Sequence, residues 1–520
     1  MANKDFSRIG VIGAGTMGSG IALASLYAGC DVILQDAFPQ MLDKASDYIK
    51  KFLDKKGVGE KFKKLQLVGE LEKLAPAQVV IEAAPEDMAL KQDIFRKLDA
   101  ICPPPAILAT NTSTLSVTGI AAAAQSSGRV AGLHFFNPAP VLPLVEIVRA
   151  AQSSQETIET LVEFAKILGK TPVVTGDTPG FIVNRVARPF YGEALRILGE
   201  GIATHEQIDE IVEQSGGFKM GPFSLMDLIG IDINAGAMRS MYEQTFGEPR
   251  YRPHPIQMEK LAAGDLGRKT GRGFYEYGRE EKEKGEGRKE KTSVGGSGRV
   301  LISEGSWAPG LAEMLTAAGY VVDSVPDPEH KPVACFIVAG RREEAERLAA
   351  WYDQSLSPDV PLLVQCADIT RSEAAASWVQ HPGRLVGFDG LFVIGSVFTL
   401  VSPKTETAEV CTQAERLIES LGKKAIWIGD GPAAVLPRIV CQLVNEAAFA
   451  QLEGVADGET IDLAMKLGVN YPKGPLEWGA DIGYGKVLDV LDHLHAEYHE
   501  ERYRACVAIR RWSREGLNDL

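Results

Sequence analysis

The stretch IGVIGAGTMGSGIA, residues 9–22, places a short apolar run before Gly13-x-Gly15-x-x-Gly18 and an apolar helical pattern after it. In such a setting the first glycine allows a tight turn, the second lets the backbone approach a pyrophosphate, and the third lets helix and strand pack closely. The N-terminus of the helix then faces the anion. The sequence therefore predicts a strand, a phosphate-binding turn and a helix, with a dinucleotide held by Gly13, Ala14, Gly15, Thr16, Met17 and Gly18.

The following strand favours NAD as that dinucleotide. DVILQD, residues 31–36, ends in Asp36, which is suited to bind the ribose 2′-hydroxyl. Ala37 and Phe38 come next, without a nearby arginine that would hold a 2′-phosphate. A glycine turn in an unrelated α/β domain is the alternative, but strand, glycines, helix and acid together argue against it. We expect NAD as the cofactor.

Length, charge and cysteine usage exclude several classes of protein. At 520 residues the chain is too long for one ordinary core, and its net charge of −14 argues against broad nucleic-acid or anionic-membrane binding. Its seven cysteines form no CxxC pair, so neither a disulfide framework nor a zinc site is predicted. The strand pattern near Arg8 leaves no room for a signal peptide, and the longest apolar run, from Leu391, is too short to cross a bilayer. We expect a cytoplasmic protein.

A charged, Gly-rich segment divides the chain into two portions. It reads GREEKEKGEGRKEKTSVGGSG, is typical of a solvated linker, and has on each side an α/β pattern that leads into a helix-rich stretch. The predicted domains are an α/β Rossmann-like NAD-binding domain (1–180), an all-α substrate domain (181–277), the linker (278–298), a degenerate Rossmann-like domain (299–430) and a second all-α domain (431–520).

The two portions resemble each other. GRVAGLH at 128–134 pairs with GRLVGFD at 383–389, which extends the resemblance to the α/β pattern. The sequence therefore predicts a second, diverged copy of the α/β plus all-α unit. Eight residues of the first helical stretch recur at one constant offset: Asp177, Pro179, Arg185, Glu193, Gly201, Asp209, Gly221 and Pro222 pair with Asp430, Pro432, Arg438, Glu446, Gly454, Asp462, Gly474 and Pro475.

His134 and Glu146 begin and end the segment HFFNPAPVLPLVE. Oxidising an alcohol with NAD requires a base for the hydroxyl proton, and histidine is the natural base near neutral pH. A carboxylate behind it would fix its tautomer and stabilise the imidazolium. The three prolines between the two residues exclude a helix, so the chain must return through a loop and the strand LVEIV, which allows the pair to meet. A buried, purely structural histidine is the alternative.

Six motifs, in order and at similar spacing, resemble those of the 3-hydroxyacyl-CoA dehydrogenases. They are GAGTMGSGIA, PEDMALK, NTSTLS, GLHFFNPAPVLPLVEIV, DTPGFIVNR and GRKTGRGFYEY, and the clear match covers residues 1 to about 277. The resemblance implies reversible NAD-dependent oxidation of (S)-3-hydroxyacyl-CoA to 3-oxoacyl-CoA, in fatty-acid or aromatic degradation. It also implies an acyl-CoA as substrate and either a homodimer or a pseudo-dimeric monomer.

The resemblance further implies individual roles. His134 would be the catalytic base and Glu146 its partner, while Ser113 and Asn184 would contact the substrate oxygen or thioester. Around NAD, the glycines and Asp36 would be joined by Glu86, Lys91, Ser113, Asn137 and Lys269. A helix cap for Asn184, a turn for Ser113, and a solvated helix start for Glu86 and Lys91 are the structural alternatives.

The second copy lacks these side chains. Gly13 and Gly18 correspond to Ser303 and Ala308, so we expect no dinucleotide there, and Ser113 corresponds to Asp368. One active site per chain is therefore predicted. The remaining counterparts are Asp389 for His134, Thr399 or Val401 for Glu146, and Pro437 for Asn184.

A histidine pair and a lysine-rich segment lie outside these motifs. His495 and His499 share a helical face without a third ligand, so no metal is expected. The lysines of residues 50–66 either reach coenzyme A phosphates or belong to a solvated hairpin. A dehydrogenase of another hydroxy acid, such as a sugar acid, and a non-enzymatic NAD- or acyl-CoA-binding protein are the rival functions.

Overall fold

The computed structural model describes residues 6–278, 295–339, 342–402 and 408–516. Most of the predicted linker, residues 279–294, lies outside them, so the linker and the domain boundaries stay predictions. By its contacts the chain forms two compact units, Met1–Val186 with Ala450–Gly474, and Ala187–Phe449 with Pro475–Leu520.

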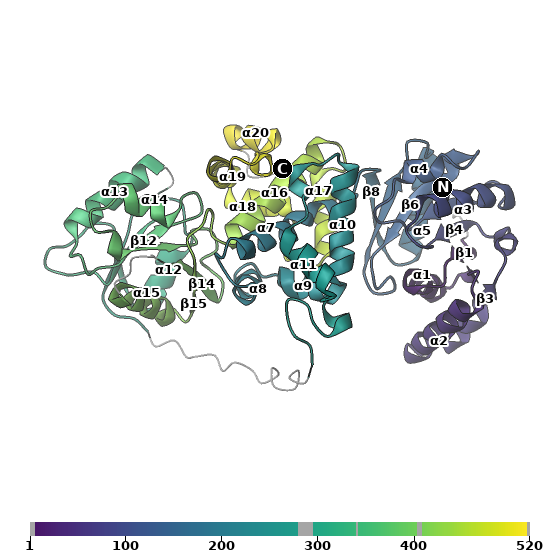
Figure 1. The fold of residues 1–520 in the computed structure, drawn as a ribbon, viewed down its shortest axis with the longest axis horizontal. Coiled ribbons are helices and arrows are strands. Elements are labelled where there is room, and N and C mark those ends of the chain that lie inside the picture. The colour runs from purple at the N-terminus through teal and green to yellow at the C-terminus, as the bar shows by residue number, and fades with distance from the viewer. Residues whose placement is uncertain (1–5, 279–294, 340–341, 403–407, 517–520) are drawn as a thin grey trace. The chain divides into compact units, whose positions relative to one another are not determined.

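An eight-stranded sheet forms the centre of the first unit (Figure 1). The strand order is β3-β2-β1-β4-β5-β6-β7-β8, and all neighbours are parallel except β6 and β7. The order reverses between β1 and β4, which is where sheets of this kind bind dinucleotides. The strands are β1 (Arg8–Ile12), β2 (Asp31–Gln35), β3 (Leu65–Val68), β4 (Val79–Glu82), β5 (Ile107–Thr110), β6 (Val130–Phe135), β7 (Leu144–Arg149) and β8 (Thr171–Gly176).

Helices cover both faces of this sheet, as parallel strands require. One face packs against α1 (Thr16–Tyr27), α2 (Pro39–Lys55) and α5 (Gln155–Ile167), and the other against α3 (Met88–Ile101) and α4 (Val117–Ala121). All four residues of β4, VVIE, are buried, because that strand has neighbours on both sides and helices on both faces.

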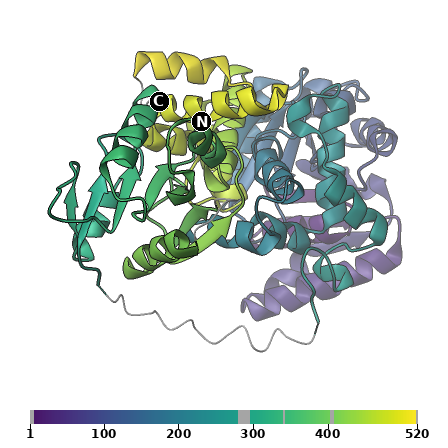
Figure 2. The same cartoon turned by 60° about the vertical axis from the view of Figure 1, so that its left-hand side comes forward.

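A seven-stranded sheet in the second unit repeats the plan. Its order, β10-β9-β11-β12-β13-β14-β15, equals that of the first sheet without β3, and its antiparallel pair, β13 with β14, occupies the same place as β6 with β7. Figure 2 brings these strands forward between their helices. The predicted second α/β copy is confirmed. Its strands are β9 (Arg299–Ile302), β10 (Val321–Asp323), β11 (Ala334–Ile337), β12 (Leu362–Gln365), β13 (Leu385–Phe388), β14 (Val397–Val401) and β15 (Lys424–Ile428), and its helices are α12 (Leu311–Ala317), α13 (Arg342–Ser355), α14 (Arg371–Ser377) and α15 (Ala408–Ser420).

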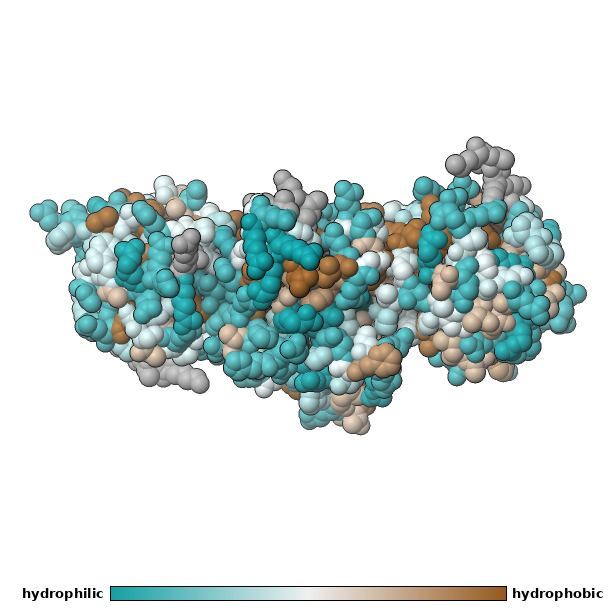
Figure 3. All heavy atoms as spheres, turned by 90° about the horizontal axis from the view of Figure 1, so that it is seen from above, coloured by the Kyte–Doolittle hydropathy of each residue, from teal (hydrophilic) through white to brown (hydrophobic). Residues whose placement is uncertain are grey.

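Each α/β part is followed by a helical part. The first comprises α6 (Val183–Val186), α7 (Arg188–Gly199), α8 (His205–Gln214), α9 (Pro222–Ile229), α10 (Ile231–Gln244) and α11 (Pro255–Ala263). The second comprises α16 (Leu436–Leu452), α17 (Gly458–Gly468), α18 (Pro475–Ile482), α19 (Tyr484–Tyr498) and α20 (Val507–Glu515). Within the described part of the chain, every helix is too short or too polar to cross a membrane. On the face drawn in Figure 3, hydrophilic residues predominate between separate hydrophobic patches.

Candidate active site

The glycine turn after β1 has the tight turn at Gly13 and the close packing at Gly18 that its sequence predicts. Gly13 has φ +90°, and a Cβ there would lie 2.6 Å from the Ala83 carbonyl oxygen. A Cβ on Gly18 would overlap the carbonyl oxygen of Gly13. Gly15 differs, since a Cβ there would meet nothing within 4 Å. The chain's own packing thus requires the first and third glycines, whereas the second borders open space into which a ligand fits.

The surroundings of this turn fit a dinucleotide. Gly15 is the N-cap of α1 and has no side chain with which to cap it, so the amides of Thr16 and Met17 remain for an anion. Asp36 follows β2 directly. Its Oδ2 accepts a hydrogen bond from the Ala14 amide (2.7 Å) and its Oδ1 one from Phe38 (2.9 Å), which fixes the carboxylate beside the turn. Together these groups provide an anion-binding helix end and an acid for a ribose.

His134 and Glu146 face each other across two antiparallel strands. The register of β6 and β7 makes them direct partners, and His134 Nδ1 lies 2.7 Å from Glu146 Oε2. Both are buried, with 6% of His134 and none of Glu146 exposed. The segment between them forms the predicted loop and returning strand. It turns through a hydrogen bond from the Val141 amide to the Pro138 carbonyl and returns as β7. The structure therefore brings the predicted pair together.

The second oxygen of Glu146 is fixed by the backbone. Oε1 accepts hydrogen bonds from the amides of Ile182 (3.1 Å) and Val183 (3.0 Å). The carboxylate therefore cannot rotate without losing two charge-assisted bonds. Because Nδ1 donates to this carboxylate, Nε2 of His134 is the ring nitrogen left to accept a proton. The ring packs between Phe136 and Phe181, with centroids 4.6 and 5.8 Å away.

Glu86 holds the segment that carries Ser113. Its Oε1 accepts bonds from Thr112 Oγ1 (2.5 Å) and the amides of Ser113 (3.0 Å) and Thr114 (3.1 Å). Burial raises the pKa of Glu86, but the Lys91 charge and these hydrogen bonds outweigh it, and the net pKa is lowered. Glu86 is therefore an ionised anchor for the turn after β5.

Lys91 lies beneath this turn as a buried cation. Only 1% of it is exposed, so a solvated helix start does not describe it. Its Nζ lies 2.7 Å from Glu82 Oε1 and 3.4 Å from Glu86 Oε2, and donates to the Ala84 carbonyl (3.2 Å). Glu82 is fully buried at the end of β4. Lys91 thus fixes the end of β4 and the segment that follows it, and its contact with NAD stays a prediction.

The other predicted residues differ in their settings. Asn184 is half-buried on α6, next to the amides that hold Glu146. Asn137 is exposed in the turn after β6. Lys269 belongs to the second unit, where it forms an ion pair with Asp232 (2.5 Å). The roles of these three residues stay predictions.

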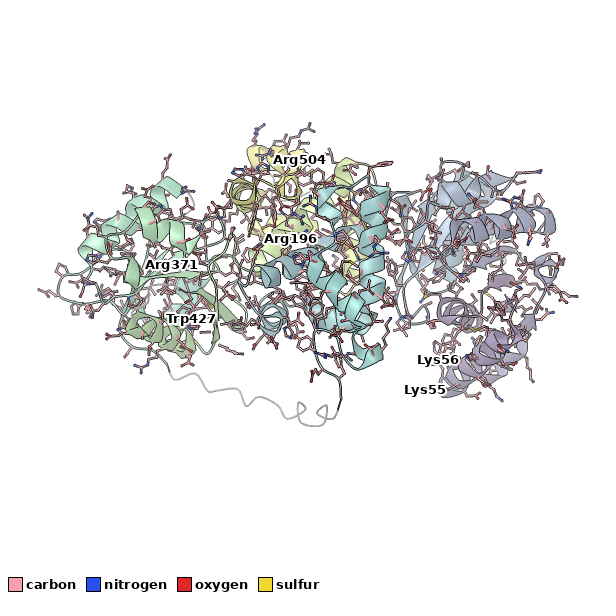
Figure 4. All side chains as sticks on the ribbon, in the orientation of Figure 1. Lys55, Lys56, Arg196, Arg371, Trp427 and Arg504 are labelled. Atoms are coloured by element: carbon pink, nitrogen blue, oxygen red, sulfur yellow. The ribbon has the colours of Figure 1, made fainter. Side chains whose placement is uncertain are left out.

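Asp177 is a residue whose role the sequence patterns did not give. Its carboxylate accepts bonds from the amides of Val117 (3.0 Å) and Thr118 (2.7 Å), and so fixes the start of α4 after the Ser113 turn. Asp430 does the same in the second copy, bonding the amides of Arg371 (2.9 Å; labelled in Figure 4) and Ser372 (2.7 Å). The recurrence of this aspartate in the sequence could have indicated its role. The aspartate recurs because it caps a helix start in each copy.

The second copy has a different geometry at the corresponding positions. The Asp389 amide bonds the Thr399 carbonyl (3.2 Å), so Thr399 rather than Val401 stands opposite it. Asp389 Oδ1 accepts from Leu391 (2.8 Å) and Phe392 (3.1 Å), and closes its own turn. Gly305 is the counterpart of Gly15 when the two copies are aligned on Gly29 and Gly319. A Cβ on Gly305 would overlap the Val338 carbonyl oxygen, whereas a Cβ on Gly15 would meet open space. The absence of a dinucleotide there stays a prediction, which this tight turn supports.

The lysines of residues 50–66 have structural contacts of their own. Lys61 Nζ donates to the Tyr27 carbonyl (2.7 Å), Lys64 Nζ to that of Gly29 (2.6 Å), and Lys56 lies over the Tyr27 ring at 3.9 Å. Lys55 and Lys56, labelled in Figure 4, end α2. Three of these lysines therefore fasten the hairpin to the C-terminal end of α1.

Among the described residues, Glu373, His493 and Glu497 form a group with metal-ligating atoms. His495 and His499 do not belong to it. The Arg342 guanidinium forms an ion pair with Glu373, and a positive charge at that place opposes a cation. The ion pair with Arg342 therefore makes this group unsuited to bind a cation.

Comparison with known proteins shows the family of the chain. Residues 8–178 match the family described as 3-hydroxyacyl-CoA dehydrogenase, NAD binding domain, and residues 180–277 and 435–518 each match its C-terminal domain. The chain is 36% identical over 511 residues to a 3-hydroxyadipyl-CoA dehydrogenase of Escherichia coli (strain K12), with 96% of each covered. It is 39% identical over 279 residues to a 3-hydroxybutyryl-CoA dehydrogenase of Clostridioides difficile, with 52% of this chain and 99% of that one covered.

A solved structure is similar over the same length. It is a 3-hydroxybutyryl-CoA dehydrogenase from Escherichia coli K12, with a TM-score of 0.78, 33% identity, and 98% of this chain and 99% of that one covered. The chain therefore belongs to the 3-hydroxyacyl-CoA dehydrogenase family and is an NAD-dependent dehydrogenase that oxidises hydroxyacyl-CoA.

Proposed function

We propose that the chain oxidises the 3-hydroxyl group of an (S)-3-hydroxyacyl-CoA, reversibly, to a 3-oxoacyl-CoA, with NAD as the oxidant, His134 as the base and Glu146 as its partner. The observation that carries this proposal is the buried 2.7 Å contact between the two side chains. His134 lies at the carboxyl end of β6, which is the edge of the sheet where the glycine turn follows β1. A histidine held by a carboxylate in this way is suited to remove a hydroxyl proton.

The proton passes to His134 Nε2, since Nδ1 already donates to Glu146. The imidazolium that forms is stabilised by the buried carboxylate, which two backbone amides hold in place. NAD, when bound, supplies the acceptor for the hydride that leaves C3. General-base assistance of this kind is typically worth about 10² to 10⁴ in rate.

Ser113 and Asn184 are the proposed hydrogen-bond donors to the substrate oxygen or thioester. Both side chains are half-buried rather than enclosed. Ser113 is anchored through Glu86, and Asn184 directly follows the Val183 amide that bonds Glu146. This connection gives the donors a fixed position relative to the base, as transition-state stabilisation requires. Asn137 and Lys269 are proposed as further contacts of NAD, with Glu86, Lys91 and Asp36.

We also propose a cytoplasmic protein with one active site per chain, either a homodimer or a pseudo-dimeric monomer. Six of the seven cysteines are buried, and the seven are recorded as thiols, which suits a reducing compartment. The name of the Escherichia coli relative that spans the chain suggests dicarboxylic acyl-CoA substrates, whereas the shorter relative is named for the butyryl substrate. Fatty-acid and aromatic degradation both use steps of this class.

The test measures NADH formation with NAD and a panel of (S)-3-hydroxyacyl-CoAs of short, medium and dicarboxylic type. Turnover with members of the panel is expected, and the highest kcat/KM assigns the acyl class. Turnover on a free hydroxy acid alone, such as a sugar acid, would contradict the proposal. NAD binding without turnover on any substrate would favour a non-enzymatic binding protein.

A further inference from the structure

The two helical parts exchange partners. Helix α17 of the second copy packs on β7, β8 and α6 of the first, and α8 of the first copy packs on β14 and β15 of the second. Figure 4 labels Trp427 of β15, whose carbonyl accepts a bond from Gln207 of α8 (2.9 Å). Each sheet is therefore supported by a helix of the other copy.

Matching hydrogen bonds mark the exchange. The Gly176 amide, at the end of β8, donates to the Val455 carbonyl (3.0 Å). The Gly429 amide, after β15, donates to the Ile202 carbonyl (2.6 Å). In the repeat Gly176 corresponds to Gly429 and Ile202 to Val455, so one contact is the reciprocal of the other.

In the first unit this support reaches the active site. A Cβ on Gly468 of α17 would lie 2.8 Å from the Leu144 side chain and 3.0 Å from that of Val183. Leu144 begins the strand that carries Glu146, and the Val183 amide bonds Glu146 directly. The backbone of α17 thus lies against the two segments that fix the catalytic carboxylate.

An ion pair joins the same segments. Arg185, buried on α6 beside Asn184, contacts Glu453 at 2.8 Å. The Glu453 side chain is 46% exposed, so it supplies a countercharge from the rim of the contact. The reciprocal pair is Arg438 with Glu200 (2.7 Å), where Arg438 also bonds Glu193.

We propose that Glu453, a residue of the degenerate half, is a positioning residue for the active site of the first half. It holds Arg185 and thereby fixes α6, which presents Asn184 to the substrate and the Val183 amide to Glu146. The inference rests on the proposed roles of Asn184 and Glu146. It gives the second half a function that its lost site residues do not provide.

The physical reason is the small size of α6, which spans only Val183–Val186 and packs on α17 of the second copy. Removing the Glu453 charge weakens the hold on a buried guanidinium, and α6 must adjust. A displacement of about 1 Å in a substrate-positioning group can cost up to about 10² in rate. Tm should change little, because solvent screens an ion pair with one exposed partner.

The experiment compares Glu453→Gln with Glu200→Gln, its counterpart at the degenerate sheet, in the full chain. We expect Glu453→Gln to lower kcat about tenfold while KM for NAD and Tm stay near wild type. Glu200→Gln should leave kcat unchanged, and Glu453→Asp should restore part of the lost rate because it keeps the charge.

Three outcomes would overturn the proposal: kcat of Glu453→Gln within twofold of wild type, an equal loss in Glu200→Gln, or a loss that tracks Tm without recovery in Glu453→Asp. Failure of the proposed function is a separate result, since it appears as wild-type protein that does not oxidise any acyl-CoA of the panel.

Discussion

The two copies of the chain keep different things. Asp177 accepts hydrogen bonds from backbone amides at the start of α4, and Asp430 does so at the start of α14, so the cap is present in both copies. At the ends of β6 and β13, His134 binds a carboxylate on the next strand, whereas Asp389 bonds amides of its own turn. The contact that fixes the helix start is present in both copies, whereas the proposed catalytic pair of the first copy is replaced in the second by a side chain that bonds its own turn. The two copies thus distinguish structural residues from the proposed catalytic ones within one molecule.

Substitution at the paired positions 134 and 389 should give the largest contrast. His134→Ala removes the proposed base and should lower kcat about 10² to 10⁴-fold, with NAD binding retained. Asp389→Asn should leave kcat unchanged, because nothing at that position takes part in the reaction. Both predictions are checked by assays of NADH formation with an acyl-CoA that the wild type oxidises, together with NAD titrations and Tm measurements. A loss of folding in His134→Ala as large as its loss of activity would restore the structural-histidine interpretation.

The glycine turns offer a second contrast. Gly15→Ala adds a methyl group into open space, so Tm should stay unchanged while the Kd for NAD rises about tenfold, a penalty of about 1.4 kcal/mol. Gly305→Ala adds one that overlaps the Val338 carbonyl oxygen, so Tm should fall while the Kd for NAD stays constant. Fluorescence titration with NADH and thermal unfolding separate the two effects. The same change in both quantities for both variants would remove the distinction between the turns.

A smaller effect concerns pH and the buried Asp389. Burial raises its pKa to about 6, against which its backbone hydrogen bonds act only in part. A raised pKa in the folded state favours folding below about pH 4 and becomes a cost as pH rises through 6. Asp389→Asn removes the charge and should therefore raise stability by about 3 kcal/mol at pH 7.5 and not at pH 4. Thermal unfolding at the two pH values is the check, and an equal Tm difference at both would contradict it.

Local sequence rules were sufficient for the parts of the site that lie close together in the chain. Gly13 and Gly18 follow from the demands of a tight turn, and the prolines after His134 exclude every path but a loop and a returning strand. The pairing of His134 with Glu146 then follows from antiparallel register. These features depend on backbone geometry over short distances, which residue types determine directly.

Contacts between distant segments could not be predicted in the same way. The sequence around Lys91 is also typical of an exposed helix start, whereas its burial depends on Glu82 at the end of β4. The choice between Thr399 and Val401 depended on a strand register that the loop length alone does not fix. The pairing of Arg185 with Glu453 requires a helix of one copy to pack on the sheet of the other. Such partners are set by tertiary packing rather than by pattern.

The exchange of helices has a genetic consequence. If Glu453 positions α6, a mutation in residues 450–474 would appear as a catalytic defect, although no residue there is proposed to touch substrate or NAD. A screen that reads activity would then map such mutations to the half without a catalytic site. Selection on enzyme activity thereby maintains residues 450–474, which include α17, while the carboxyl ends of the strands in the second sheet are free to diverge.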